Sequence, residues 1–320
     1  MRSVLVTGCG SGIGLETALA FARRGDRVHA CVRDPATAGE LLRRADAEQL
    51  TLDVPRLDVT DDASVTAAVT AVQDRYGPLD VLVNNAGVDR TGPAETMPPD
   101  HARTVFETNF WGPLRVARAV LPGMRARGSG VIVNVSSLAA RTFAVPHGGF
   151  YAASKAALGA LSEALYAEVQ PFGIRVVCLE PGSFATAIQR ASRAGAADGQ
   201  PPGSGPYAAD HAWLDRFLAR VAEGAADSAE AARAVLAAAD DPTTPLHTVV
   251  GDDARAALEF LDGVSYEQWL PRFLEQARSL GGPPPPRPPA NDLGGGARPP
   301  RPPPPPPGAR GAPARAGPAP

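Results

Sequence analysis

The sequence predicts an α/β fold, a doubly wound parallel sheet covered by helices on both faces. Short apolar segments alternate with longer, alanine-rich amphipathic stretches through residues 1–280. The apolar segments are rich in β-branched residues and nearly unbroken in hydrophobicity, which is typical of strands that are buried on both faces. Beyond residue 280 this alternation stops, so the predicted domain ends there.

The predicted strands follow one another at intervals that leave room for a helix between each pair. In order along the chain, they occupy residues 3–8, 27–32, 80–87, 130–137, 174–182 and 247–251. Parallel strands need such crossover helices, because a tight turn cannot join them. Residues 183–222 begin with a loop rich in proline and glycine after the carboxyl end of the fifth strand, where such folds bind ligands. We therefore expect a mobile lid at residues 183–222.

Residues 281–320 are predicted to form a disordered tail rich in proline, glycine and arginine. They hold 17 of the 34 prolines and too few apolar side chains to build a core. Runs such as "RPPRPPPPPP" also favour extended polyproline II, which a proline-binding partner could recognise.

The bulk composition excludes several classes of protein. With 44% hydrophobic residues and a formal net charge of -3, the 320-residue chain is typical of a soluble globular protein without affinity for nucleic acid. No apolar run approaches the roughly 20 residues of a membrane helix, and a strand begins at residue 3, so we expect a cytoplasmic protein. Cys9, Cys31 and Cys178 are far apart and lie in or beside apolar segments, which predicts core residues rather than disulfides or a metal site.

The first predicted strand leads into "TGCGSGIG", which places Gly8, Gly12 and Gly14 between a strand and an amphipathic helix. Glycines let the backbone approach a pyrophosphate, and the helix N-terminus offers free N–H groups and a positive dipole end. The loop therefore predicts a dinucleotide site, although glycine turns join strands to helices in many other proteins.

Lys155, in "FYAASKAALGAL", is the only lysine of the chain. A lysine retained among arginines indicates a site that needs a compact ammonium whose pKa its surroundings can move. Tyr151 lies four residues earlier, and on a helix this spacing places both side chains on one face. An ammonium nearby would favour the phenolate, so the pair predicts that Tyr151 acts as a general acid and base. A surface lysine without a special role is the alternative.

The chain resembles the classical short-chain dehydrogenase/reductase family over residues 3–254. After the glycine loop come "LDV", "NNAG", "ETNFWG", "NVSS", "YAASK" and "EPGSFAT", in the order of that family. The resemblance implies a single Rossmann-type doubly wound domain and an NAD(P)-dependent oxidoreductase that interconverts an apolar secondary alcohol and its ketone, or an alcohol and its aldehyde, by hydride transfer. It implies the catalytic residues Asn109, Ser137, Tyr151 and Lys155. It implies a cofactor site formed by Gly8, Ser11, Gly12, Ile13, Gly14, Arg33, Asp58, Val59, Asn85, Ala86, Gly87, Tyr151, Lys155, Pro181, Gly182, Phe184 and Thr186.

The resemblance also assigns roles to the catalytic residues. Ser137 would hydrogen-bond the substrate oxygen, Asn109 would hold a water that links Lys155 to solvent, and Lys155 would also hold the nicotinamide ribose. Ser137 precedes Tyr151 by 14 residues, one more than is usual in the family, so Ser136 is an alternative. Because successive strand residues face opposite sides, only one of the two serines can point into the cleft.

The second strand bears on the choice of nicotinamide. Val32 stands where relatives that prefer NAD carry an acidic residue, and Arg33 can pair with a 2'-phosphate. Asp34 could compete for Arg33 or accept the 2'-hydroxyl instead. The sequence therefore favours NADP(H), with NAD(H) as the alternative.

The predicted substrate pocket is apolar. Phe143 and Val145 would line it beside Ser137 and Tyr151, which suits a hydrophobic small molecule. Assembly as a homodimer or homotetramer through long helices is possible. The rival hypothesis is a catalytically silent, cofactor-binding regulatory or scaffold protein that uses its proline-rich tail, but the complete set of catalytic residues argues against it.

Overall fold

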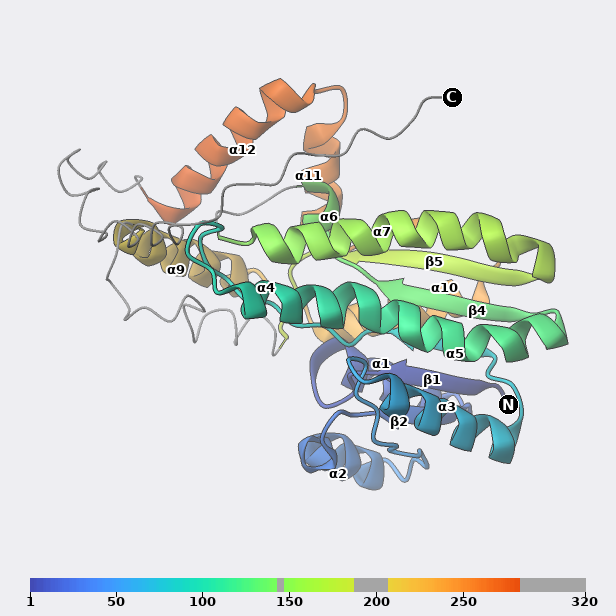
Figure 1. Ribbon diagram of the computed structural model, residues 1–320. Coiled ribbons are helices and arrows are strands. Elements are labelled where there is room, and N and C mark those ends of the chain that lie inside the picture. The colour runs from blue at the N-terminus through green and yellow to red at the C-terminus, as the bar shows by residue number, and fades with distance from the viewer. Residues whose placement is uncertain (143–146, 187–206, 283–320) are drawn as a thin grey trace, which may run out of the picture. The chain divides into compact units, whose positions relative to one another are not determined.

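The six predicted strands form one parallel sheet in the order β2-β1-β3-β4-β5-β6 (Figure 1), as a computed structural model of the chain shows. The structure describes residues 1–142, 147–186 and 207–282. The predicted tail beyond residue 282, much of the predicted lid, and Phe143 and Val145 lie outside these residues. The strands are β1 (Ser3–Thr7), β2 (Arg27–Cys31), β3 (Val81–Asn84), β4 (Gly130–Val135), β5 (Ile174–Pro181) and β6 (His247–Val250).

The helices alternate with the strands as the sequence predicted. In the first half of the chain they are α1 (Gly12–Arg23), η1 (Pro35–Ala38), α2 (Gly39–Ala47), α3 (Asp62–Tyr76), α4 (Pro99–Phe106), the π-helix η2 (Glu107–Trp111) and α5 (Gly112–Arg127). In the second half they are α6 (Ala139–Thr142), α7 (Gly149–Val169), η3 (Gln170–Phe172), α9 (Ala208–Glu223), α10 (Ser228–Asp240), α11 (Asp252–Leu261) and α12 (Tyr266–Gly281).

The helices cover both faces of the sheet because the strand side chains alternate between two apolar cores. Val4 and Val6 of β1 pack in the core shared with α1 and α10, whereas Leu5 packs in the core shared with α3, α5 and α7. All three side chains are fully buried. This two-sided burial explains the unbroken hydrophobic runs from which the strands were predicted.

All six strands end earlier than the sequence predicted, β3 and β4 by the most. β3 stops at Asn84 rather than at residue 87, and β4 stops at Val135 rather than at residue 137. Residues that follow both strands line a cleft at the carboxyl ends of the sheet. β1 has β2 on one side and β3 on the other, so the strand order reverses at this place, where doubly wound sheets bind ligands.

α9 and α12 form a helical cap beyond the carboxyl ends of the strands (Figure 1). Trp213, Leu214 and Phe217 of α9 make a small apolar core of their own, to which Phe273 of α12 adds. Leu218 of the same helix reaches the cleft. The cap thus connects the C-terminal helices to the ligand site.

Cys9, Cys31 and Cys178 are all free and buried, which confirms their predicted place in the core. In the part of the chain that the structure describes, no helix has the length and apolar character needed to cross a membrane.

Candidate active site

A cleft of about 480 Å³ opens at the carboxyl ends of the strands. Most residues of the predicted cofactor and catalytic sets lie on its wall. They are Gly8, Ser11, Gly12, Ile13, Arg33, Asp58, Val59, Asn85, Ala86, Gly87, Ser137, Tyr151, Lys155, Pro181, Gly182, Phe184 and Thr186. Of the predicted site residues that the structure describes, only Gly14 and Asn109 are not on this wall.

The glycine loop has the shape that a closely approaching ligand requires. Gly8 and Gly12 have φ angles of +74° and +57°, which side chains rarely adopt. A Cβ on Gly8 would lie 2.8 Å from the Cα of Ala86, and a Cβ on Gly14 would overlap the carbonyl oxygen of Gly8. Gly14 therefore acts beneath the cleft, by allowing the first turn of α1 to pack against the loop.

The "NNAG" segment after β3 is tied to the glycine loop by hydrogen bonds. The hydroxyl of Thr7 accepts from the backbone nitrogens of Asn85 and Ala86, each at 3.0 Å. The side-chain amide of Asn85 donates to the carbonyl oxygens of Thr7 at 2.9 Å and Gly8 at 3.2 Å. These bonds fix two walls of the cleft relative to each other. The cradle of backbone N–H groups at the start of α1 fits the pyrophosphate of a dinucleotide.

The predicted catalytic residues come together from two segments. Ser137 follows β4, whereas Tyr151 and Lys155 lie one turn apart on α7. The hydroxyl of Ser137 is hydrogen-bonded to the phenol of Tyr151. Nζ of Lys155 donates to the carbonyl oxygen of Val135 at 2.8 Å and lies 5.8 Å from the centre of the Tyr151 ring. The helical spacing of the sequence thus produces the predicted common face.

Ser136, the alternative to Ser137, points away from the phenol. Its side chain is 4% exposed, and its hydroxyl donates to the carbonyl oxygen of Lys155 at 3.0 Å. The two serines diverge as strand alternation requires. Ser137 is therefore the serine that can hydrogen-bond a substrate oxygen beside Tyr151, despite its longer spacing along the chain.

The electrostatics of the pair differ from the expectation. Burial raises the pKa of Tyr151 well above its usual value, and the nearby Asp89 carboxylate raises it further, while the hydrogen bond from Ser137 only partly offsets these effects. The expected lowering of this pKa by Lys155 is not found. Burial lowers the pKa of Lys155 to about 8, against an ordinary value of 10.5. At neutral pH the protein therefore holds a protonated phenol beside an ammonium that is close to losing its charge.

Asn109 lies behind the wall of the cleft. It lies in the π-helix η2, is fully buried, and does not line the cleft. Its Oδ1 accepts from the backbone nitrogen of Val88 at 2.8 Å, while its Nδ2 donates to the Val88 carbonyl at 2.9 Å and to the Ser154 hydroxyl at 3.0 Å. The side chain therefore positions the cleft wall and the catalytic helix, and its amide atoms already have these protein partners.

Sequence reasoning missed several residues of the cleft. Thr37, Val88, Asp89, Thr108, Leu218 and Val221 all line it. They come from the short helices η1 and η2, from the loop after β3 and from α9, and the approach of these segments to the strand ends leaves no periodic signal in the sequence. Asp89 could have been suspected, because it directly follows "NNAGV" at a strand end.

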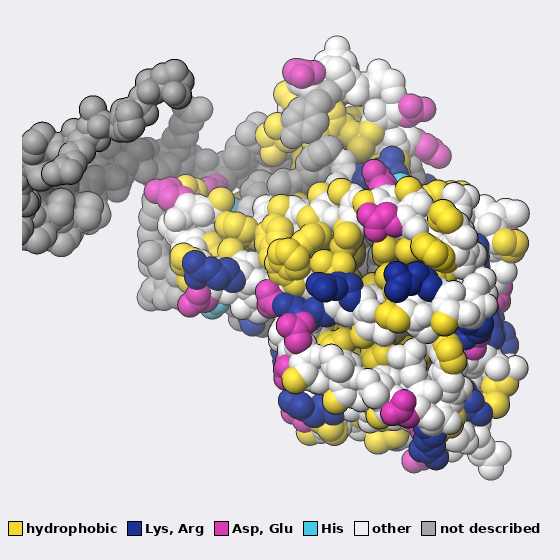
Figure 2. Space-filling view, turned by 45° about the vertical axis from the view of Figure 1, so that its right-hand side comes forward, with side chains coloured by type: hydrophobic (Ala, Val, Ile, Leu, Met, Phe, Trp, Pro, Cys, Tyr) yellow, Lys and Arg dark blue, Asp and Glu magenta, His cyan; other side chains and the backbone are white. Residues whose placement is uncertain are grey.

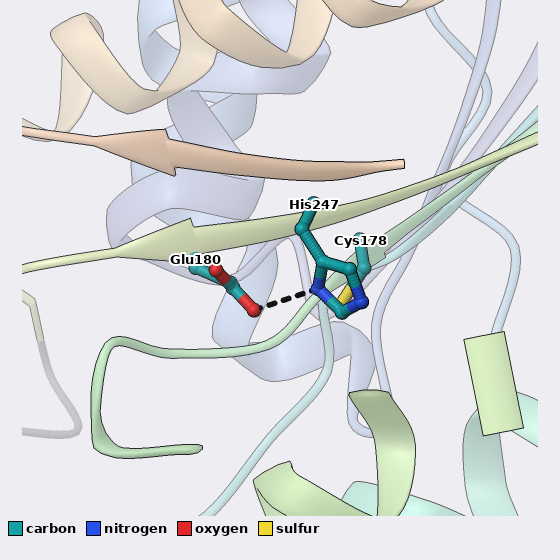
Figure 3. Close-up of side chains that lie close together, drawn as sticks. All are labelled: Cys178, Glu180 and His247. Atoms are coloured by element: carbon teal, nitrogen blue, oxygen red, sulfur yellow. Dashed lines mark hydrogen bonds and ion pairs between the residues drawn. The ribbon is translucent and has the colours of Figure 1, made fainter. Parts of the chain in front are cut away.

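A further polar cluster lies against α7, between β5 and β6 (Figure 3). Cys178, Glu180 and His247 bring a thiol, a carboxylate and an imidazole within 4.8 Å of one another. Nδ1 of His247 lies 2.8 Å from Oε1 of Glu180, and the other carboxylate oxygen lies 3.2 Å from Arg141.

Its chemistry favours a hydrogen-bonded network over a metal centre. Both ring nitrogens of His247 already have carboxylate partners, Nδ1 with Glu180 at 2.8 Å and Nε2 with Glu163 at 3.0 Å. Burial raises the pKa of Cys178 to about 11. Arg141 already balances the charge of the buried Glu180. Glu180 directly precedes Pro181 and Gly182, so we interpret this network as a brace behind the cleft wall.

Comparisons with known proteins agree with this geometry. The family model described as short chain dehydrogenase matches residues 2–197. An uncharacterized oxidoreductase, YusZ, of Bacillus subtilis is 41% identical over 189 residues. The matched residues make up 58% of this chain and 66% of that protein, so the chain spans slightly less than two thirds of the length of YusZ. Human retinol dehydrogenase 8 is 39% identical over 222 residues, covering 68% of this chain and 70% of that protein.

Solved structures share the fold over most of their length. A short-chain dehydrogenase from Streptomyces avermitilis superposes with a TM-score of 0.70 and 36% identity, covering 87% of this chain and 99% of that one. A gluconate 5-dehydrogenase from Burkholderia cenocepacia, solved with NADP and tartrate, has a TM-score of 0.65 and 31% identity, covering 80% and 95%. The chain, from its glycine loop to its catalytic helix, belongs to the short-chain dehydrogenase family.

Proposed function

We propose that this protein is an NADP(H)-dependent oxidoreductase that interconverts an apolar secondary alcohol and its ketone. The observation that carries the proposal is the hydrogen-bonded pair of Ser137 and Tyr151, with Lys155 beside it, at the end of a cleft that begins at the glycine loop. A phosphate cradle joined to a proton donor of this kind suits hydride transfer coupled to proton transfer.

The protein's own residues would orient the substrate and supply the proton. A nicotinamide, when bound, supplies or accepts the hydride. Ser137 and Tyr151 would both hydrogen-bond the substrate oxygen, and Tyr151 would give its phenolic proton to that oxygen in the reduction. The raised pKa of Tyr151 keeps the phenol protonated at neutral pH, which is the form that reduction needs. Lys155, whose ammonium faces the same space, would hold ribose hydroxyls and stabilise the phenolate after transfer.

The preference for NADP(H) rests on Arg33. Val32 is buried in the sheet and offers no carboxylate, and Arg33 is exposed at the rim of the cleft. The Asp34 carboxylate caps η1 by accepting from the nitrogen of Ala36 at 3.0 Å. A guanidinium in this position can pair bidentately with a 2'-phosphate. The NADP bound to the Burkholderia gluconate 5-dehydrogenase supports the same choice, with NAD(H) as the alternative.

An apolar substrate is proposed from the lining of the cleft beyond the catalytic residues. Val88, Phe184, Leu218 and Val221 contribute apolar side chains from three separate segments. Relatives named retinol dehydrogenase 8 and 3-ketodihydrosphingosine reductase are consistent with a substrate that has an apolar body. Phe143 and Val145 remain proposed lining residues outside the described part of the chain.

The function is tested by incubating the purified protein with NADPH and a panel of apolar ketones while the nicotinamide absorbance is followed. We expect turnover by the wild type and a loss of at least about 1,000-fold in Tyr151→Phe, because general acid catalysis alone contributes about 100- to 10,000-fold. Tyr166→Phe is the matched control, since Tyr166 is an exposed tyrosine of the same helix. NADPH binding without turnover in the wild type would favour a cofactor-binding regulatory protein.

Further parts of the proposal concern assembly and location. Tyr166 of α7, Trp111 of η2 and Phe172 of η3 are large apolar side chains with 39%, 46% and 47% exposure. Figure 2 shows apolar side chains gathered on one face and interrupted by basic groups. We propose a cytoplasmic homodimer or homotetramer, which light scattering would distinguish from a monomer. Residues 281–320 are proposed as an appendage to a 1–280 domain, with a lid at 183–222, so truncation after residue 282 should preserve turnover.

A further inference from the structure

We infer that Asp89 selects the substrate, by binding a hydrogen-bond donor, an amino or hydroxyl group, on the carbon next to the reacting carbonyl. This inference rests on the proposed function and narrows its substrate class. The substrate would be a largely apolar ketone or alcohol with one polar substituent beside the reactive carbon.

The position of Asp89 is the first reason. Asp89 lines the same cleft as Ser137, Tyr151 and Lys155. The charge of its carboxylate reaches both Tyr151 and Lys155, and raises the pKa of each. A substrate held by Tyr151 through its oxygen would therefore bring its neighbouring carbon close to this carboxylate.

The loop that carries Asp89 is fixed at both ends. The backbone nitrogen and carbonyl of Val88, the preceding residue, are both bound by the side chain of Asn109. At the other end, the backbone nitrogen of Gly92 donates to the carbonyl of His147 at 2.9 Å, just before the catalytic helix begins. Recognition groups need such fixation, because a carboxylate on a free loop would pay for its ordering when the substrate binds.

The charge of Asp89 makes this position selective. An apolar substrate would lie against a half-buried carboxylate without offering it a donor, whereas an amino or hydroxyl group would form a charge-assisted hydrogen bond with it. A carboxylate has about four acceptor sites, so contacts within the protein leave capacity for a substrate donor. A donor there would also reduce the negative field on Tyr151, whose phenol must become a phenolate as it gives up its proton.

The rest of the cleft is consistent with a single polar contact. Val88, Leu218 and Val221 present apolar side chains. Ligand sites of this kind commonly combine an apolar wall with a few fixed polar groups that set orientation. Asp89 would decide which substituent is accepted, while the apolar wall would hold the remaining carbon chain.

The test compares three ketones of matched size: 3-nonanone, 1-hydroxy-2-octanone and 1-amino-2-octanone supplied as its hydrochloride. Each is reduced with NADPH by the wild type, Asp89→Asn and Asp89→Leu, and kcat/KM is measured. For each protein, the preference is kcat/KM for a polar ketone divided by kcat/KM for 3-nonanone. Because a hydroxyl also changes the reactivity of the carbonyl, the decisive quantity is the preference of the wild type divided by that of the variant. We expect the preference for both polar ketones to fall about 10- to 100-fold in Asp89→Leu. In Asp89→Asn only the preference for the amino ketone should fall to that extent, since the amide still accepts a hydrogen bond.

Two controls separate the inference from the proposed function. Asp100→Asn removes an exposed carboxylate of α4 outside the cleft and should leave all preferences unchanged. Binding of the ketones to the NADP complex is measured by saturation-transfer NMR, which needs no turnover. If no ketone is reduced but the hydroxy ketone still binds less well to Asp89→Leu, the proposed reaction fails and the recognition role stands. Unchanged preferences and unchanged binding in an Asp89→Leu protein that binds NADPH normally would overturn the inference.

Discussion

The side-chain amide of Asn109 hydrogen-bonds both backbone groups of Val88, with Oδ1 2.8 Å from its nitrogen and Nδ2 2.9 Å from its oxygen. Val88 lies beyond the end of β3, so the amide supplies backbone partners that no strand provides there. Because Asn109 is fully buried, this end of the loop is held by a protein side chain rather than by solvent.

Replacement of Asn109 by leucine should therefore destabilise the protein. Asn109→Leu leaves two backbone groups of Val88 without their partner, and each unsatisfied buried group costs about 1–3 kcal/mol. We expect the free energy of unfolding, measured by urea denaturation, to fall by about 2–4 kcal/mol. Gln170→Leu, which alters an exposed amide, should change it by less than about 0.5 kcal/mol. Equal effects of the two variants would contradict a stabilising role of the hydrogen bonds between Asn109 and Val88, the Asn109 clamp.

The sequence sufficed for those parts of the molecule that follow a repeating pattern. The six strands were predicted from their short, largely apolar runs, and Tyr151 and Lys155 were paired because a helix brings residues four apart together. The glycine loop was recognisable because its φ angles exclude most side chains at Gly8 and Gly12. At these places neighbouring residues determine the local structure, so the sequence pattern alone was enough to predict it.

The remainder depends on contacts between distant segments. The Asn109 clamp needs a π-helix and a loop 21 residues away, and nothing in "ETNFWG" shows that the amide will face Val88. The pKa of Tyr151 is raised by burial and by Asp89, and neither effect can be read from the spacing of Tyr151 and Lys155. The contact between Glu180 and His247 likewise joins two strands that are far apart in the chain.

The lowered pKa of Lys155 predicts how cofactor binding depends on pH. Below its pKa of about 8 the ammonium can donate to ribose hydroxyls with a full charge, and above it this interaction weakens. We expect the NADPH dissociation constant, measured by nicotinamide fluorescence, to rise as the pH passes through about 8. The pKa of the neighbouring Cys178 is about 11, which is too high for this thiol to produce an inflection near pH 8. A Lys155→Met variant should bind more weakly and lack the inflection.

The same shift has a consequence for stability, with the opposite trend in pH. The unfolded chain binds the Lys155 proton more tightly than the folded protein, because the pKa changes from 10.5 to about 8 on folding. Stability therefore rises with pH between about 8 and 10.5 and carries the full penalty below 8. The difference in unfolding free energy between wild type and Lys155→Met should change over this window by on the order of 3 kcal/mol. A difference that is constant with pH would exclude the shift.

Arg33 should determine the choice between the two nicotinamide cofactors. Removing a guanidinium that pairs with the 2'-phosphate costs about 1.5–3 kcal/mol of binding. Arg33→Ala should thus weaken NADPH binding about 10- to 100-fold and leave NADH binding nearly unchanged. The matched control is Arg43→Ala, an exposed arginine of α2 that pairs with Glu40 and does not line the cleft. Equal losses of NADPH and NADH binding in Arg33→Ala would show that Arg33 attracts both cofactors and does not recognise the 2'-phosphate.

Gly14 and Gly39 offer a matched pair of glycine substitutions at helix starts. A Cβ on Gly14 would overlap the side-chain amide of Asn85 and the carbonyl oxygen of Gly8, which is backbone and cannot rotate away. Gly14→Ala should therefore displace the cofactor loop and lower the free energy of unfolding by about 1–3 kcal/mol. It should also weaken NADPH binding, because the loop and the "NNAG" segment share the amide of Asn85.

Gly39, the first residue of α2, has open space around its Cβ position and a helical φ of -54°. Gly39→Ala should accordingly stabilise the protein by about 0.4–1 kcal/mol and leave NADPH binding unchanged, because it reduces the conformational entropy of the unfolded chain alone.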